Sequence, residues 1–211
     1  KNNIFLKKWN VTEDVVFISQ YREDSKNHPE FFNISGKSVL KDDFYKVEKK
    51  LLPVLLDFCS QNNLNLVICG AGRAKDEYDF FQRTIGSDKF IFKEFTTEMS
   101  SYDNSNNCRF AVSIDSTLGL EIFGRKIPIA FFPSRSKFIN LESFKSILSI
   151  NKVTEYFWTD SLEASEINKV LNYVKNLKNE ELEGIWKKYY SIIMNYDKNN
   201  YEIKQLIKKL Y

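Results

Sequence analysis

Residues 109–133, RFAVSIDSTLGLEIFGRKIPIAFFP, decide the fold, because they predict a strand, a polar loop, a short helix and a second strand in close succession. The apolar run 110–114 is short and contains β-branched residues, as in a strand that is buried on both faces. Asp115, Ser116 and Thr117 end this strand, and Ser116 or Thr117 can cap a helix over residues 118–123. A second buried strand is expected over residues 127–132.

The same alternation of strand and helix runs along most of the chain. Strands are expected over 15–19, 64–69 and 90–92, and helices over 44–62 and 75–85, whereas 20–41 is predicted to be a polar loop and 102–108 to lead into the strand at 110–114. This order favours an α/β fold with a Rossmann-like parallel β-sheet, helices on both faces and right-handed crossovers.

The last fifty residues predict helices only, over about 161–177, 180–196 and 201–210. The interleaved Lys and Glu of these helices indicate solvated faces. Nothing in the composition divides the chain, so we expect a single domain over 1–211, with a sheet core at about 14–160 and a helical tail at about 161–211.

Composition excludes several classes of function. The 211 residues are 43% hydrophobic and carry a net charge of +3, which is too small and too mixed in sign to indicate nucleic-acid binding. No apolar run is long enough for a membrane span. Three cysteines without close spacing and a single histidine predict no zinc site and no Cys–His nucleophile, so the cysteines are expected to be reduced core residues of a cytoplasmic protein.

Polar residues gather where the strand 110–114 meets the following helix. Glu121 lies four residues after Thr117, so a hydroxyl and a carboxylate share one helical face. Ligands of open α/β sheets bind outside the carboxyl ends of the strands, and a helix N-terminus offers N–H groups to phosphate. Hydroxyls for phosphate and a carboxylate for sugar hydroxyls suit a nucleotide. The alternative is that Ser116 and Thr117 only cap the helix and that Glu121 is solvated.

This pattern resembles a known family. A strand ending in Asp-Ser-Thr, a Glu four residues later and Pro128 seven residues after that Glu are similar to the nucleotide-sugar-binding, C-terminal half of GT-B glycosyltransferases, and above all to bacterial surface-carbohydrate (lipopolysaccharide or capsule) biosynthesis proteins. The resemblance covers about residues 14–160. Many members have a small residue after the Glu and a Gly two before the Pro, where this chain has Ile122 and Lys126.

The resemblance implies roles for individual residues. The hydroxyl loop of Ser116 and Thr117 would meet the donor phosphate, and Glu121 would hold the ribose. At the end of the first strand, Ser19 and Gln20 would lie beside the donor, and Arg22 would make a bidentate phosphate contact that stabilises the departing group. The alternative for Arg22 is a surface salt bridge.

Further residues extend the candidate site. Gly70, Gly72 and Arg73 follow the second strand, where they allow a close backbone approach to a base or phosphate, or form a plain turn. His28 and Pro29 resemble the His-Pro pair of bacterial GT-B sialyltransferases and Kdo transferases, which contacts a CMP donor. Tyr102 either stacks on the base or packs in the core.

Three functions fit these observations. The first is a metal-independent glycosyltransferase, with this chain as its donor-binding domain, that transfers a sugar from a nucleotide-sugar to a surface polysaccharide or lipopolysaccharide acceptor. The second is a nucleotide-sugar epimerase, and the third is a noncatalytic α/β binding module.

The resemblance also implies partners and a location. They are a nucleotide-sugar, a glycan acceptor and an N-terminal acceptor-binding domain outside this chain, with no cofactor, metal or nucleic acid. The expected location is the cytoplasm, with peripheral association at the inner face of the cell membrane as the alternative.

Overall fold

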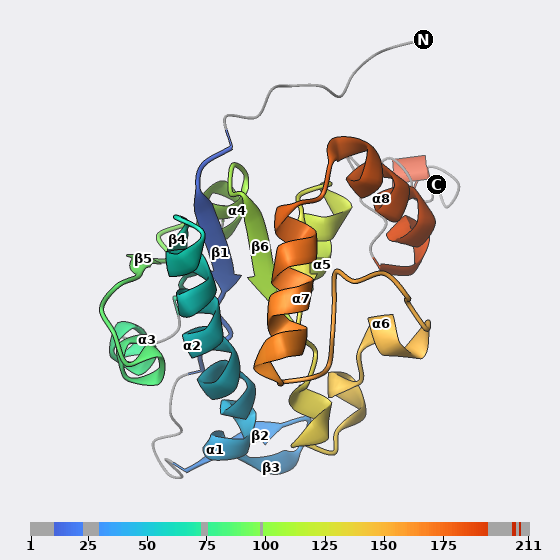
Figure 1. Cartoon of the computed structure of the whole chain (residues 1–211). Helices are drawn as coiled ribbons and strands as arrows, with labels where there is room; N and C mark the ends of the chain where they lie inside the picture. Colours follow the sequence, from blue (N-terminus) through green and yellow to red (C-terminus); the bar gives the residue numbers. More distant parts are fainter. Residues whose placement is uncertain are drawn as a thin grey trace.

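The centre of the protein is an all-parallel β-sheet (Figure 1). The computed structural model describes residues 11–22, 30–72, 76–97 and 99–193, together with 204, 205 and 207. The five strands lie in the order β5-β4-β1-β6-β7. Their bounds are β1 Asp14–Ile18, β4 Asn65–Cys69, β5 Ile91–Lys93, β6 Phe110–Ser113 and β7 Ile129–Phe131. The parallel α/β sheet that the sequence predicts is therefore confirmed.

The strands form because their apolar runs can be buried on both faces. Val16 pairs with Val67 of β4 on one side and with Ala111 of β6 on the other, and all three side chains are inaccessible to solvent. β1 is thus the innermost strand of the core. Continuous apolar runs of this kind are typical of parallel sheets, because helices cover both faces.

Helices flank the sheet on both sides. Figure 1 shows α2 and α7 side by side in front of the sheet, and α4 and α5 behind it. In α2, apolar side chains at helical spacing are buried against the strands, which accounts for most of the helix predicted over 44–62. The helices on the two faces are α2 Lys46–Gln61, α3 Glu77–Ile85, α4 Ser100–Ser105, α5 Thr117–Gly124 and α7 Ala164–Lys175.

The prediction of a polar loop over 20–41 is wrong for its second half. Residues 31–40 form an antiparallel hairpin, with β2 Phe31–Ile34 and β3 Lys37–Leu40, followed by the short helix α1 Lys41–Phe44. Ser35 and Gly36 both have positive φ (52° and 77°), as a tight two-residue hairpin turn requires. The strands are short and half polar, so their alternation is a weak signal in the sequence.

The segment between 102 and 108 leads into β6, as predicted, and α4 occupies much of it. No element was expected between β7 and the tail, where the structure has η1 Arg135–Lys137, η2 Glu142–Phe144 and α6 Ile147–Ile150. Phe131 makes an isolated parallel bridge with Trp158, which adds one residue to the edge of the sheet beside β7.

The tail is helical as predicted, as far as the structure describes it. α7 and α8 Asn179–Ile193 correspond to the first two predicted helices. Of the third, over 201–210, only residues 204, 205 and 207 are described, and they are helical. Within the described parts of the chain, no helix has both the length and the apolar character that crossing a membrane requires.

Candidate functional site

The candidate site lies at the carboxyl edge of the sheet, where the strand order reverses. From β1 the chain continues to β4 and β5 on one side, and later to β6 and β7 on the other. Open α/β sheets bind ligands at this switch point. Ser19 and Gly70 directly follow β1 and β4, and Ser116 lies three residues after β6, so the parallel strands place all three at the expected edge.

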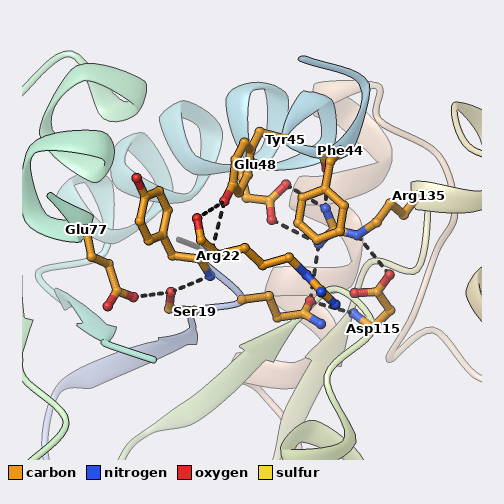
Figure 2. A network of polar contacts seen from close by, with 10 residues as sticks. Ser19, Arg22, Phe44, Tyr45, Glu48, Glu77, Asp115 and Arg135 are labelled. Atoms are coloured by element: carbon orange, nitrogen blue, oxygen red, sulfur yellow. Dashed lines mark hydrogen bonds and ion pairs between the residues drawn. The ribbon is translucent and has the colours of Figure 1, made fainter. Parts of the chain in front are cut away.

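A buried arginine ties together the loops around the switch point (Figure 2). Arg135, in η1 just after β7, is fully buried. Its Nε donates to Asp115 Oδ2 at 2.9 Å, and its Nη2 donates to Glu48 Oε1 at 2.9 Å and to Gln20 Oε1 at 3.2 Å. Its Nη1 donates to the carbonyl of Phe44, whose ring centroid lies 3.9 Å from the guanidinium carbon. One residue thereby connects β1, α2, β6 and β7.

The cluster has more acidic than basic groups, because the two carboxylates of Glu48 and Asp115 bind one guanidinium. Burial by itself lowers the pKa of Arg135, but Glu48 and Asp115 outweigh it and hold that pKa above the ordinary value, so the guanidinium stays charged. Burial raises the pKa of Glu48, and Arg135 only partly opposes this. Burial, with a smaller effect of the Asp115 charge, therefore favours a proton on Glu48 more than on a solvated glutamate.

The cluster also orients Gln20. Gln20 Oε1 accepts from Arg135 and, at 3.3 Å, from the backbone N–H of Asp115. With the oxygen so engaged, Nε2 is a donor that has no hydrogen-bond partner among the described residues. Asp115 Oδ1 is likewise buried without a partner within the described parts of the chain.

Ser19 and the glycine loop after β4 are held by Glu77, at the start of α3. The Glu77 side chain is buried and accepts from the Ser19 hydroxyl, from Ala71 N at 2.8 Å and from Gly72 N at 3.2 Å. These donors therefore bind a carboxylate of their own chain. Gly72 has φ +66°, and a Cβ there would lie 2.5 Å from Cβ of Phe95, so close packing explains this glycine.

Ser116 and Thr117 lie at the start of α5. Ser116 is the N-cap residue, a position that the sequence predicts for it or Thr117, but its hydroxyl makes no capping bond. Thr117 is exposed. α5 rests tightly on β6, because a Cβ on Gly119 would lie 2.5 Å from Ser113 Oγ. This contact sets the position of both hydroxyls relative to the sheet.

Glu121 has a partner within the chain. The Tyr102 hydroxyl, on α4, donates to Glu121 Oε2, and the guanidinium carbon of Arg125 lies 4.0 Å from the centroid of the Tyr102 ring. Glu121 is thus not merely solvated, and the half-buried Tyr102 packs against Arg125 and Glu121.

The remaining predicted residues are placed as follows. Arg22 is half-buried, and its backbone N–H donates to the Tyr45 hydroxyl at 2.9 Å. Its guanidinium carbon is 5.3 Å from the Phe44 ring centroid, and Figure 2 shows the side chain extending toward the Arg135 cluster. His28 and Arg73 lie outside the described residues.

The cysteines are buried and free, as predicted. Burial raises the pKa of the Cys59 and Cys108 thiols to about 12, which keeps them protonated and unreactive. In the described parts of the chain, no group of three or more His, Cys, Asp or Glu side chains is placed to hold a metal ion.

The sequence pattern did not mark Glu48, Glu77 and Arg135 as parts of the site. Glu48 and Glu77 fall on helices whose apolar spacing was the visible signal, and their carboxylates are buried only because of tertiary packing. For Arg135, the one available signal was its position three residues after the last predicted strand, at the edge where ligands bind.

Comparison with known proteins identifies the family to which the chain belongs. A protein-family model described as "putative O-antigen biosynthesis protein" matches residues 1–211. No curated protein and no solved structure gives a significant match. The parallel sheet of this chain brings polar loops together at one edge. Because the family match spans the entire chain, the protein belongs to this O-antigen biosynthesis protein family.

Proposed function

We propose that this chain is the donor-binding domain of a metal-independent GT-B glycosyltransferase that uses a nucleotide-sugar in O-antigen assembly. One observation carries the proposal: the free Ser116 hydroxyl and the exposed Thr117 lie at the start of α5, at the switch point of the sheet. The family supplies the process, because its description names O-antigen biosynthesis.

The groups around this point suit a phosphate. Gln20 Nε2, the hydroxyls of Ser116 and Thr117, and the first N–H groups of α5 are all donors, and Figure 2 shows the side chain of Arg22 extending toward the Arg135 cluster that holds Gln20. Arg135 is not available for a ligand, because it is buried against two carboxylates. Its role in the proposed site is to position Gln20 and Asp115.

Glu121 is the proposed ribose ligand. Its carboxylate shares a helical face with Thr117, one turn further along α5. Since Tyr102 donates to Oε2, a ribose hydroxyl must either bond to Oε1 or replace the phenol. Both are favourable for a carboxylate, which offers about four lone-pair positions.

Catalysis at such a site would rest on stabilising the nucleotide phosphate as it leaves. Hydrogen-bond donors that are already in position stabilise the negative charge that develops on the leaving phosphate in the transition state. No rearrangement of the protein is needed at that moment. The base that activates the acceptor hydroxyl would come from an acceptor-binding domain outside this chain. An epimerase needs a separate acid–base pair, whereas Glu48 and Asp115 are both bonded to Arg135.

Calorimetric titration with UDP, CMP, GDP and their sugars tests the proposal. At least one nucleotide should bind, and Thr117→Val should weaken that binding about tenfold or more, because a bond to a charged phosphate is lost. Thr84→Val on α3 is the matched control and should leave the affinity unchanged. A protein that binds no nucleotide, or binds it equally well after Thr117→Val and Ser116→Ala, would support the noncatalytic module instead.

A further inference from the structure

A second site lies far from the switch point, in an open pocket of about 400 Å³. Side chains from the C-terminal half of α7, the start of α8 and the loop before α7 line it. This volume falls within the range of small-molecule sites, which is about 300–1,000 Å³. The residues used below are Tyr156, Lys169, Asn172, Tyr173, Asn176 and Glu181.

The pocket is at the opposite edge of the sheet from the proposed donor site. The carbonyl of Lys175, at the end of α7, accepts from Arg109 Nη2 at 3.3 Å, and Arg109 directly precedes β6. Ser116, in contrast, follows the carboxyl end of β6. A ligand in this pocket would therefore not be the nucleotide, and its assignment to the surface glycan rests on the proposed function.

Two tyrosines form a corner of the pocket. The ring centroids of Tyr156 and Tyr173 are 6.1 Å apart, and their planes meet at 66°. Lys169 Nζ lies over the Tyr156 ring, 4.5 Å from its centroid. Flat aromatic faces with a polar tip suit a ligand that has both C–H surfaces and hydroxyls, such as a pyranose ring.

Several neutral polar groups in the pocket are uncommitted, whereas Glu181 Oε2 accepts from the backbone N–H of Lys178 at 2.9 Å. The hydroxyls of Tyr156 and Tyr173 and the side-chain amide of Asn176 have no hydrogen-bond partner among the residues that the structure describes. Asn172 Nδ2 donates to the carbonyl of Asn168 at 2.9 Å, which leaves its Oδ1 as an acceptor. Burial, with Glu181 and Glu155 nearby, raises the pKa of Tyr173, so its phenol remains a donor at neutral pH.

The charges select the class of ligand. Within the lining, Lys169 and Glu181 contribute one charge of each sign, and Lys169 Nζ also lies 3.9 Å from Glu166 Oε2, so the pocket has no excess positive charge to attract a phosphate. Donors, acceptors and aromatic faces without net charge match an uncharged saccharide. We infer that this pocket binds a neutral sugar residue of the surface glycan, away from the site of sugar transfer.

Saturation-transfer NMR with a panel of methyl glycosides tests the inference. The panel comprises neutral hexoses, 6-deoxyhexoses and N-acetylhexosamines, with methyl glucuronide as an anionic comparator. At least one neutral glycoside should show transfer, and Tyr156→Ala should weaken its binding about tenfold, because one stacking face is lost. Tyr78→Ala, at an exposed tyrosine on α3, is the matched control and should bind like the parent.

The remaining outcomes also decide the question. Asn176→Ala should weaken binding with little effect on folding and serves as the second variant beside Tyr156→Ala. Transfer to no neutral glycoside, transfer that survives both variants, or stronger binding of the glucuronide would overturn the inference. Nucleotide titration of Tyr156→Ala should match the parent, so failure here is distinguishable from failure of the proposed donor site.

Discussion

At the scale of the residue, the site depends on a charge that has no contact with solvent. Arg135 bonds to Asp115, Glu48, Gln20 and the Phe44 carbonyl, so all three of its nitrogens have acceptors. A buried ion cluster contributes little net stability when complete, but loss of one member leaves the other charges uncompensated. Its value here is geometric, because it fixes Gln20 and Asp115.

Glu48→Gln should change how stability depends on pH. The folded protein holds a proton on Glu48 more readily than the unfolded chain does, because burial raises its pKa above the ordinary value of 4.5. The contribution of Glu48 to stability is therefore greatest below pH 4.5 and declines as the pH rises through the raised pKa. Glu48→Gln keeps an oxygen that accepts a hydrogen bond from Arg135. Because glutamine does not titrate, the stability of this variant lacks the decline with pH that Glu48 causes.

Urea unfolding of both proteins at several pH values measures the effect. Relative to the parent, Glu48→Gln should gain in free energy of unfolding as the pH increases above 4.5. Glu142→Gln, on an exposed carboxylate in η2, is the control and should follow the parent. A constant difference between Glu48→Gln and the parent would contradict the assigned protonation.

Glu121 and Tyr102 allow the proposed ribose contact to be tested from both sides. Glu121→Ala should weaken nucleotide binding by about 1.5–3 kcal/mol, or about 10- to 150-fold, because charge-assisted hydrogen bonds are lost. Tyr102→Phe removes the competing phenol donor and should maintain or strengthen binding. Calorimetry and thermal unfolding of each variant separate affinity from stability. Unchanged affinity in Glu121→Ala, with a parent that binds nucleotide, would remove Glu121 from the site.

At the scale of the element, the close contact of α5 with β6 sets the start of the helix. A Cβ at Gly119 would lie 2.5 Å from Oγ and 2.6 Å from Cβ of Ser113. Contacts this short require α5 or β6 to move. The amino end of α5, with Ser116 and Thr117, would move with it.

Gly119→Ala should therefore destabilise the protein by about 1–3 kcal/mol and also weaken nucleotide binding. Gly184→Ala on α8 is a matched control, because a Cβ there meets nothing within 4 Å. That substitution should stabilise by about 0.5–1 kcal/mol through the better helix propensity of alanine. Chemical denaturation measures the free energy of unfolding of both variants, and calorimetric titration measures nucleotide binding. Equal stabilities of the two variants would mean that α5 can shift without cost.

At the scale of the whole molecule, the topology makes one edge of the sheet the meeting point of loops that are distant in sequence. The loops after β1 and β6 are neighbours because these two strands pair in parallel register. The groups that they would present to the proposed phosphate are hydroxyls, amides and a guanidinium. Such donors bind phosphate directly.

Nucleotide binding should accordingly be insensitive to chelators. The affinity measured with EDTA should agree with that measured without it within about twofold, and bound nucleotide should raise the melting temperature equally in both conditions. Added Mg²⁺ is the complementary measurement and should not strengthen binding. Loss of binding on addition of EDTA would require a metal bridge that the proposed site does not include.

Local pattern in the sequence determined the type and order of most elements. Apolar runs such as 110–114 and the helical spacing in 44–62 predict the parallel sheet and its covering helices, because burial on two faces or on one stripe leaves a periodic signal. The end of each strand locates the edge of the sheet, so Ser19, Gly70 and Ser116 could be assigned to one edge. The hairpin at 31–40 was missed because its strands are short and half polar.

Tertiary structure alone decided how the polar residues pair. Arg135 meets residues 20, 87 and 115 positions away, namely Asp115, Glu48 and Gln20. Glu77 meets Ser19 across 58 positions. Hydrogen bonds over such separations leave no periodicity in the chain, because they arise only when packing brings the elements together and burial requires each polar group to find a partner. The sequence thus located the edge where a ligand would bind, and the packing determined which side chains there remain available to it.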